Sequence, residues 1–249
     1  EAWKEMGRSF FILKKYDRAI EAFDAVLVLK PDSGEILFEK GLSYSHLGQP
    51  ESALDAFNAC IGLGLDTSRL HAEKGLVLSR LDRNEDAIAS FDRALELDST
   101  DVVSHLVKGE ILEKIARYED AIREYDATLL LDPENSRAHR GRGVALVKLA
   151  RYEDAVIALD RALEQDTTDS GLLSCKGYSL YKLFRFKEAV ESFGKSLRRE
   201  PQNIFALIYR GKALLHLKRW EEAVSAFDKV IVLDNQHTTA WYYRGISYK

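Results

Sequence analysis

The sequence predicts an all-α solenoid built from antiparallel helix hairpins, and a repeat of 34 residues is the main observation behind this prediction. Glycine returns at this step eight times: Gly7, Gly41, Gly75, Gly109, Gly143, Gly177, Gly211 and Gly245. A fixed period of this length is typical of stacked supersecondary units, none of which can bury its apolar face alone. We therefore expect neighbouring repeats to pack against each other and to share a continuous core.

Two further columns of residues follow the same step. Alanine forms the first column: Ala19, Ala53, Ala87, Ala121, Ala155, Ala189 and Ala223. The second column is aromatic or leucine: Phe23, Phe57, Phe91, Tyr125, Leu159, Phe193 and Phe227. Small residues at fixed positions predict close helix contacts, because a large side chain would force the helices apart. A glycine inside a helix costs about 1 kcal/mol relative to alanine, so its recurrence implies packing that offsets this cost.

Each repeat carries two apolar stripes with helical spacing. In the fourth repeat, Leu106 and Ile111 belong to the first stripe, and Ile122 and Tyr125 belong to the second. This spacing predicts two amphipathic helices in each repeat. Proline ends the second helix in three repeats, at Pro31, Pro133 and Pro201. Acidic pairs such as Glu119-Asp120 stand where a second helix begins, and we interpret them as complementing the helix N-terminus rather than as catalytic carboxylates.

The spacing of these columns resembles the tetratricopeptide repeat family, in a tandem array of the prokaryotic style. The family pattern Trp-x2-Leu-Gly-x2-Tyr, Ala-x3-Phe, Pro is followed by Trp3, Met6, Gly7, Phe10, Ala19, Phe23 and Pro31. The resemblance covers the whole chain and implies a single right-handed superhelical solenoid over residues 1–249. Its repeats are expected at 1–33, 34–67, 68–101, 102–135, 136–169, 170–203, 204–237 and a partial 238–249.

The second repeat departs most from the pattern. It contains Gly48-Gln49-Pro50 in its turn, and Gly62 and Gly64 where other repeats have an unbroken helical end. Two glycines in one turn predict a shortened second helix. We interpret this as a local defect, with a hinge near residues 61–68 as the alternative.

The resemblance also implies which side chains contact a ligand. In this family the first helix of each repeat lines the concave face, so the resemblance implies that the exposed first-helix positions form a peptide-binding groove. In this sequence the predicted groove residues are Phe38, Leu42, Leu76, Leu106, Arg140, Val144, Tyr178, Tyr181, Lys182, Phe205, Ile208, Tyr209, Lys212, His216, Tyr242 and Tyr243. The alternative is that several of them are buried against neighbouring helices.

From Tyr178 onward the predicted groove is both aromatic and basic, with Lys182, Lys212, His216 and Lys249 supplying the charge. Tyrosine combines a large contact area with a hydroxyl group and is common at recognition sites. We therefore expect a protein or peptide partner that is acidic and carries apolar side chains. An amphipathic helix fits equally well.

No catalytic, cofactor or metal site is predicted. The chain has no GxxxxGKS or GxxxxGKT loop, no GxSxG and no HExxH motif. His71, His105 and His139 share one repeat position, but neighbouring repeats lie on the order of 10 Å apart, too far to share one metal ion. The family's clamp for chaperone C-termini also fails, because Arg8, Glu39 and Glu73 replace its Asn and Arg residues.

A basic residue precedes each glycine from the second repeat onward: Lys40, Lys74, Lys108, Arg142, Lys176, Arg210 and Arg244. We expect these side chains to pair with acidic residues of adjacent repeats rather than to follow a nucleic-acid backbone. The acidic majority of the chain also disfavours nucleic-acid binding. Residues 170–249 carry 14 lysines and arginines against seven acidic residues, a net charge of +7, which leaves −11 for residues 1–169.

This charge difference makes head-to-tail self-association an alternative function, and recruitment of substrate for a separate enzymatic domain is another. No apolar run is long enough to span a membrane, so we expect a cytoplasmic protein without membrane contact. Cys60 and Cys175 lack metal-site spacing and are expected to be packing residues. Because the chain begins at Glu1 and has one methionine, Met6, we expect it to be an excerpt of a longer protein.

Overall fold

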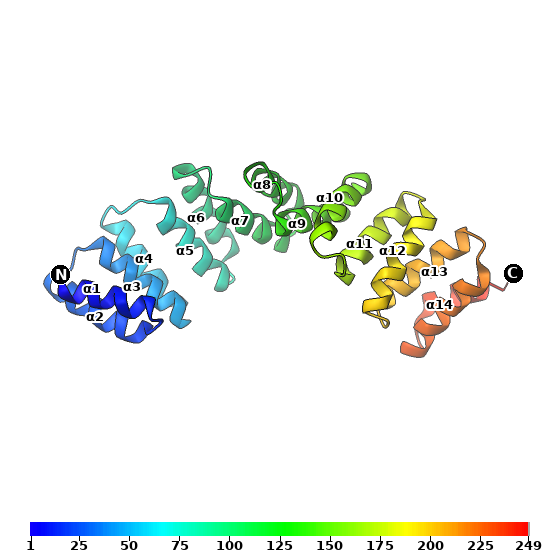
Figure 1. The fold of residues 1–249 in the computed structure, drawn as a ribbon, viewed down its shortest axis with the longest axis horizontal. Coiled ribbons are helices and arrows are strands. Elements are labelled where there is room, and N and C mark those ends of the chain that lie inside the picture. Colours follow the sequence, from blue (N-terminus) through cyan, green and yellow to red (C-terminus); the bar gives the residue numbers. More distant parts are fainter. Residues whose placement is uncertain (249) are drawn as a thin grey trace. The chain divides into compact units, whose positions relative to one another are not determined.

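In the computed structural model, residues 1–248 are described and form fifteen α-helices (Figure 1). The helices group into two compact units, an N-terminal unit from Glu1 to Ile115 and a C-terminal unit that begins at Ala116. The assignment of residues 1–249 to one solenoid stays a prediction, whereas the all-α hairpin architecture is confirmed.

The helices follow the predicted repeats. The N-terminal unit contains α1 (Ala2–Ile12), α2 (Tyr16–Leu29), α3 (Gly34–Leu47), α4 (Pro50–Gly62), α5 (Ser68–Arg80), α6 (Asn84–Leu97) and α7 (Val102–Lys114). The C-terminal unit contains α8 (Tyr118–Leu131), α9 (Ser136–Lys148), α10 (Tyr152–Gln165), α11 (Ser170–Lys182), α12 (Phe186–Arg199), α13 (Ile204–His216), α14 (Trp220–Leu233) and α15 (Thr238–Ile246). None of the helices in residues 1–248 has the length and apolar character needed to cross a membrane.

Odd-numbered helices are the first helices of the hairpins, and even-numbered helices are the second. The two helices of a hairpin pack together, as α3 with α4 and α11 with α12 do. First helices of successive hairpins also contact each other within a unit, as α3 with α5 and α11 with α13 do. The first helices therefore form a continuous layer in each unit, with the second helices packed against it.

Most glycines of the column face a buried side chain of their own hairpin. This side chain is a phenylalanine ring at Gly7, Gly41, Gly75, Gly177 and Gly211, and it is Leu159 at Gly143. A Cβ atom on Gly211 would lie 2.6 Å from Cζ of Phe227, and one on Gly7 would lie 2.5 Å from Cε1 of Phe23. Both rings are fully buried. The predicted close approach of the helices is thus a contact between the glycine backbone and a phenylalanine ring.

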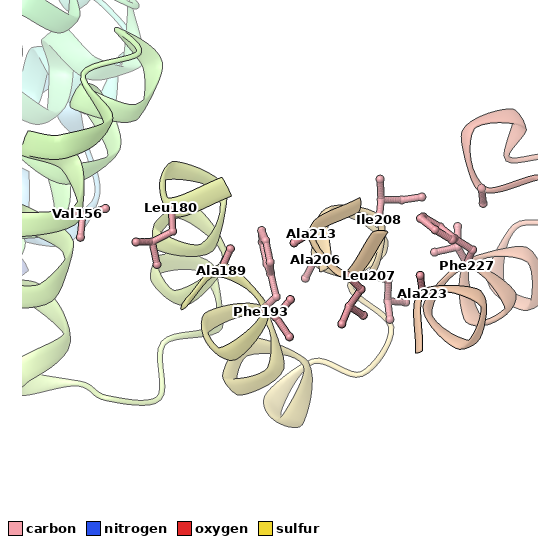
Figure 2. Close-up of a cluster of buried hydrophobic side chains, with 14 residues drawn as sticks. Val156, Leu180, Ala189, Phe193, Ala206, Leu207, Ile208, Ala213, Ala223 and Phe227 are labelled. Carbon is pink, nitrogen blue, oxygen red and sulfur yellow. The ribbon is translucent and has the colours of Figure 1, made fainter. Parts of the chain in front are cut away.

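The largest described core cluster of the C-terminal unit combines these rings with the alanine column. Figure 2 shows Phe193 on one side of α13 and Phe227 on the other, with Ala189 and Ala223 beside them. These alanines are fully buried, so their small side chains set the distance between neighbouring helices. Several predicted groove residues, including Tyr178, Tyr181 and Tyr209, are partly buried and pack against the same cluster.

The two kinds of helix begin differently. Four first helices are capped by an Asp or Asn side chain that accepts a hydrogen bond from a backbone N–H of the first turn. The capping residues are Asp101, Asn135, Asp169 and Asn203. Second helices have acidic residues in the first turn, as predicted, and in α6, α8, α10, α12 and α14 one of these pairs with the arginine before the helix. Arg151 Nη2 lies 2.7 Å from Oδ2 of Asp154.

The second repeat has the predicted shorter helix. Helix α4 has 13 residues, one fewer than α2 or α6. Gly64 takes a positive φ of 83°, and the Leu65 N–H donates to the Cys60 carbonyl at 3.1 Å, which closes the helix end. Burial raises the pKa of the Cys60 thiol to about 11, so this cysteine is an unreactive packing residue.

Every first helix from α1 to α13 is followed by a residue with positive φ. Gly48 occupies this position once, whereas the other repeats place there Lys14, Asp82, Ala116, Ala150, Phe184 and Lys218. Left-handed backbone is strained for residues that carry a Cβ atom. The structure therefore contains six positions in residues 1–248 where glycine would relieve strain.

Replacing Ala150 by glycine is expected to stabilise the protein by about 0.5–1 kcal/mol, because its φ of 58° favours glycine and its side chain is exposed. Urea denaturation followed by circular dichroism measures this change. The matched control is Ala89→Gly, at an exposed position inside α6, which should lose about 1 kcal/mol. A loss of stability in both variants would show that the turn at Ala150 is not strained.

Candidate functional site

The basic column is neutralised in most repeats, as predicted. In the N-terminal unit Lys40 Nζ lies 2.6 Å from Oδ1 of Asp24, and Lys108 Nζ lies 2.6 Å from Oδ1 of Asp92. In the C-terminal unit the same pairing joins Arg142 with Asp126, Lys176 with Asp160, and Arg244 with Asp228. Each pair joins a first helix to the second helix of the preceding repeat. These cations therefore hold the repeats together.

His71, His105 and His139 occupy the same position in three repeats, and each contacts the loop that precedes its helix. His139 Nε2 lies 2.9 Å from the Pro133 carbonyl, and His105 Nε2 lies 3.3 Å from the Ser99 carbonyl. Trp241 occupies the equivalent position in the last repeat and donates its indole N–H to the Asn235 carbonyl at 2.9 Å. His71 instead contacts the Asp66 carboxylate at 2.7 Å. In α5, α7, α9 and α15 a ring nitrogen at this position thus ties the first helix to the preceding loop.

The predicted groove residues Phe38 and Leu42 line a hollow of about 440 Å³ in the N-terminal unit. Arg69 lies over the Phe38 ring, with its Cζ atom 5.4 Å from the ring centre. Leu42 is itself almost fully buried, at 7% exposure, and Leu106 of α7 is 5% exposed. Leu76 is half-buried. Among these residues, Phe38 offers the most accessible apolar contact.

This hollow already contains carboxylates that neutralise its cations. Arg8 donates to Oε1 of Glu39 at 2.5 and 2.8 Å and to Oε1 of Glu35 at 2.6 Å. Lys4 contacts Oε2 of Glu35 at 2.8 Å. Arg8 and Lys4 therefore already have carboxylate partners within the chain.

The C-terminal unit brings together a much larger group of aromatic and basic side chains, from α10 to α15. We call this group the aromatic surface: Tyr152, Tyr178, Tyr181, Lys182, Phe186, Phe205, Tyr209, Lys212, His216, Tyr242 and Tyr243. Nine of these eleven residues are among the sixteen predicted from the sequence. Tyr152 and Phe186 are the additional two.

Tyr209 is the centre of the aromatic surface. Its ring centre lies 4.9 Å from that of Tyr178, 5.4 Å from that of Tyr181 and 4.7 Å from that of Phe205. The Tyr178 and Tyr181 rings meet it edge to face, the arrangement that aromatic pairs prefer. Because the rings support each other, they form a rigid surface that loses little conformational entropy when a ligand binds.

Two lysines lie on these rings. Lys182 Nζ is 5.5 Å from the centre of Tyr178, while Lys212 Nζ is 4.9 Å from Tyr209 and 4.7 Å from Tyr243. Neither lysine forms an ion pair within residues 1–248, in contrast to most of the basic column. Burial and the nearby ammonium of Lys182 lower the pKa of Lys212. Lys249, also predicted to add positive charge here, lies outside the described residues.

His216 extends the surface along α13. Its ring stacks on Phe186, with centres 4.2 Å apart and an angle of 2° between the planes. The N-terminal unit repeats this arrangement, where His46 stacks on Tyr16 at 5.0 Å. Each histidine lies in the last turn of a first helix and each partner begins the preceding second helix, so the stack is a recurring contact between repeats.

The other predicted residues differ in accessibility. Ile208 is 6% exposed and belongs to the core, while Tyr242 is 65% exposed. Arg140 Nη1 lies 3.1 Å from Oδ2 of Asp169, so its charge is neutralised by the next repeat. Val144 is half-buried and packs against the core of α8–α11. Of these four residues, only Tyr242 adds accessible area to the aromatic surface.

Tyr152 and Phe186 were missed because the sequence-based prediction considered only first helices. Both begin a second helix, at a repeat position that is aromatic in five repeats: Tyr16, Tyr118, Tyr152, Phe186 and Trp220. Tyr152 contacts Tyr178 at 6.0 Å between ring centres. The aromatic column at this position is the signal that would have identified them.

Comparison of the sequence with protein families gives two matches. The tetratricopeptide repeat family matches residues 4–64, 38–102 and 106–170, which together are more than half of the chain. The family described as anaphase-promoting complex, cyclosome, subunit 3 matches residues 148–230. No curated protein sequence matches the chain.

Several solved structures have the same fold. The crystal structure of YrrB, described as a TPR protein with an unusual peptide-binding site, is 24% identical, with a TM-score of 0.70, and the match covers 77% of this chain and 99% of that chain. The C-terminal part of a TPR repeat-containing protein from Cytophaga hutchinsonii is 16% identical, with a TM-score of 0.76 and coverage of 95% and 97%. MamA from Desulfovibrio magneticus RS-1 is 19% identical, with a TM-score of 0.63 and coverage of 69% and 97%. At these identities the likeness establishes the fold.

Proposed function

The chain belongs to the tetratricopeptide repeat family, and on that premise we propose that it is a protein-interaction scaffold whose aromatic surface binds a peptide segment of a partner protein. The segment carries a carboxylate next to apolar side chains. Lys182 and Lys212 contact the carboxylate, and the rings around Tyr209 contact the apolar side chains.

The observation that carries this proposal is the pair of lysines that lie on aromatic rings and have no acidic partner within residues 1–248. Lys212 is partly buried and has no acidic partner in residues 1–248, so its charge is poorly solvated. A ligand carboxylate would replace the lost hydration with a charge-assisted hydrogen bond. The five ion pairs of the basic column are a contrast within the same chain, because there the protein supplies its own carboxylate.

The aromatic side chains support the same proposal. Phe205 and Tyr242 are 44% and 65% exposed, although large aromatic residues are usually more buried. Tyrosine-rich surfaces of this kind are common at the centres of protein interfaces. The YrrB structure, whose description names a peptide-binding site, has the same fold and is consistent with such a role.

Selection of peptides from a random display library, with the purified chain as bait, tests the proposal. We expect the selected peptides to share an Asp, a Glu or a free C-terminal carboxylate beside aromatic or branched apolar residues. Selection in parallel with Lys182→Gln/Lys212→Gln, which keeps the rings but removes both charges, should lose this acidic preference. Recovery of the same acidic motif by the double variant, or of a basic motif by the original chain, would contradict the proposal.

The affinity for a selected acidic peptide should depend on pH through Lys212. Its pKa is lowered in the free protein, and a bound carboxylate raises it, so binding takes up protons on the alkaline side. Affinity should therefore be constant near neutral pH and should fall as pH rises through the lowered pKa. Fluorescence anisotropy from about pH 6 to about pH 11 measures this.

The control for the pH dependence is Lys212→Arg, because arginine stays protonated over this range. This variant should bind at neutral pH and should lose the part of the alkaline decline that Lys212 causes. An identical decline in both proteins would show that Lys212 does not contact the carboxylate.

A further inference from the structure

The basic column has two exceptions, and one of them leaves a cation without any carboxylate partner. Asp24 and its equivalents pair with five of the seven basic residues, but Asn58 stands opposite Lys74 and Gly194 stands opposite Arg210. Arg210 still has the Glu222 carboxylate at 3.9 Å. Lys74 has no ion pair within residues 1–248.

Lys74 faces a hollow of about 330 Å³ between α4, α5 and α6 in the N-terminal unit. Its lining residues are Leu54, Asn58, His71, Lys74, Leu78, Arg83, Asp86, Ala89, Ser90 and Arg93. Besides Lys74, this set contains two arginines and a histidine, against a single carboxylate. The lining is therefore basic, and its apolar part is supplied by two leucines and an alanine.

The other cations of this hollow each have an acidic partner. Arg83 Nη2 lies 2.7 Å from Oδ2 of Asp86, and His71 Nε2 lies 2.7 Å from Oδ1 of Asp66. Arg93 also contacts Asp66. Among the cations that line this hollow, Lys74 is therefore the one without an ion pair to a described residue. Burial lowers the pKa of Lys74, and the nearby Asp86 carboxylate, which forms no ion pair with it, opposes this shift only in part.

We propose that this hollow is a carboxylate-binding site that takes an Asp or Glu side chain of a partner protein. The incoming carboxylate pairs with Lys74 in the place that Asp24 takes beside Lys40. The amide of Asn58 donates a second hydrogen bond, and Leu54 and Ala89 contact the methylene groups of the acidic side chain.

A carboxylate is the favoured ligand because the chain itself uses one at the equivalent positions. Lys40 and Lys108, which stand one repeat before and after Lys74, both bind a single aspartate oxygen at 2.6 Å. The hollow at Lys74 exceeds the size of a carboxylate group, so it also has room for the stem of the side chain. This site lies between α4, α5 and α6 of the N-terminal unit and does not depend on the aromatic surface.

Nuclear magnetic resonance of ¹³C-lysine-labelled protein tests the site. N-acetylglutamate N-methylamide is titrated while the Cε–Hε signals of Lys74, Lys40 and Lys108 are followed. We expect a saturable shift at Lys74, whereas Lys40 and Lys108 should not move because their partners are internal. Asn58→Asp supplies the missing carboxylate and should weaken binding about tenfold, which corresponds to about 1.4 kcal/mol.

Three results would overturn the proposal. Equal, non-saturating shifts at all three lysines would indicate a general ionic effect rather than a site. A saturable shift with inorganic phosphate but none with the glutamate probe would assign the hollow to phosphate groups. Unchanged binding in Asn58→Asp would likewise place the probe away from Lys74. Because the probe has no aromatic or extended apolar part, none of these outcomes depends on the aromatic surface.

Discussion

Replacing Gly211 by alanine is expected to destabilise the protein by about 1–3 kcal/mol, because the new methyl group would overlap a buried ring. The added Cβ atom would lie 2.6 Å from Cζ of Phe227, well inside van der Waals contact. Phe227 has no exposed surface and cannot turn toward solvent. Alanine gains about 1 kcal/mol in helix propensity, so the steric conflict must exceed that gain.

Gly194→Ala is the matched control for this substitution. Gly194 also lies within a helix, but a Cβ atom there would meet no atom within 4 Å. Its replacement should stabilise the protein by up to about 1 kcal/mol through helix propensity alone. Thermal unfolding of both variants measures the difference. A further variant, Gly211→Ala combined with Phe227→Leu, should recover part of the loss if the ring is the cause.

A gain in stability from Gly211→Ala would contradict the role of the glycine column. It would mean that the helices of the hairpin separate without penalty, and that the recurrence of glycine has another origin. Equal effects at Gly211 and Gly194 would have the same meaning, since only helix propensity would then distinguish glycine from alanine.

The double variant Tyr178→Ala/Tyr209→Ala is expected to weaken binding of a selected acidic peptide about 30-fold or more, equivalent to about 2 kcal/mol. These two rings touch at the centre of the aromatic surface, and both lysines rest on them. Their removal therefore takes away apolar contact area and the rings that position the charges. Fluorescence anisotropy measures the change in affinity.

Two controls separate this effect from a loss of folding. Tyr178→Phe/Tyr209→Phe keeps the rings and removes only the hydroxyl groups, so most of the affinity should remain. Tyr16→Ala removes a stacked ring in the N-terminal unit, outside the aromatic surface, and should leave affinity unchanged. If the alanine double variant keeps its affinity while its helical circular dichroism is intact, the peptide binds elsewhere.

Much of the fold was predictable because the repeat fixes local contacts. In every full repeat a glycine and a large side chain, Phe, Tyr or Leu, have the same spacing as Gly211 and Phe227, so this contact was predictable from the hairpin itself. The pairing of Lys40 with Asp24 was also predictable, since neighbouring repeats place these columns side by side. Such contacts form within one repeat or between neighbouring repeats, so the 34-residue period is enough to predict which positions meet.

The accessibility of individual groove positions was harder to predict. Leu42, Leu106 and Ile208 occupy first-helix positions of the predicted groove, yet each is less than 9% exposed. Arg140 is neutralised by Asp169, which also caps the next first helix. Exposure at these positions depends on how closely successive first helices pack and on which side chain the next repeat supplies. A position number within the repeat does not contain that information.

The most direct test of the proposed function is nuclear magnetic resonance of protein labelled with ¹³C in its tyrosine rings, titrated with an acidic peptide from the selection. The chain has eleven tyrosines, distributed over both units. Binding at the aromatic surface predicts shifts for Tyr178, Tyr181, Tyr209 and Tyr243, and none for Tyr44 of the N-terminal unit. Shifts confined to Tyr44 and its neighbours, with the aromatic surface unmoved, would contradict the assignment.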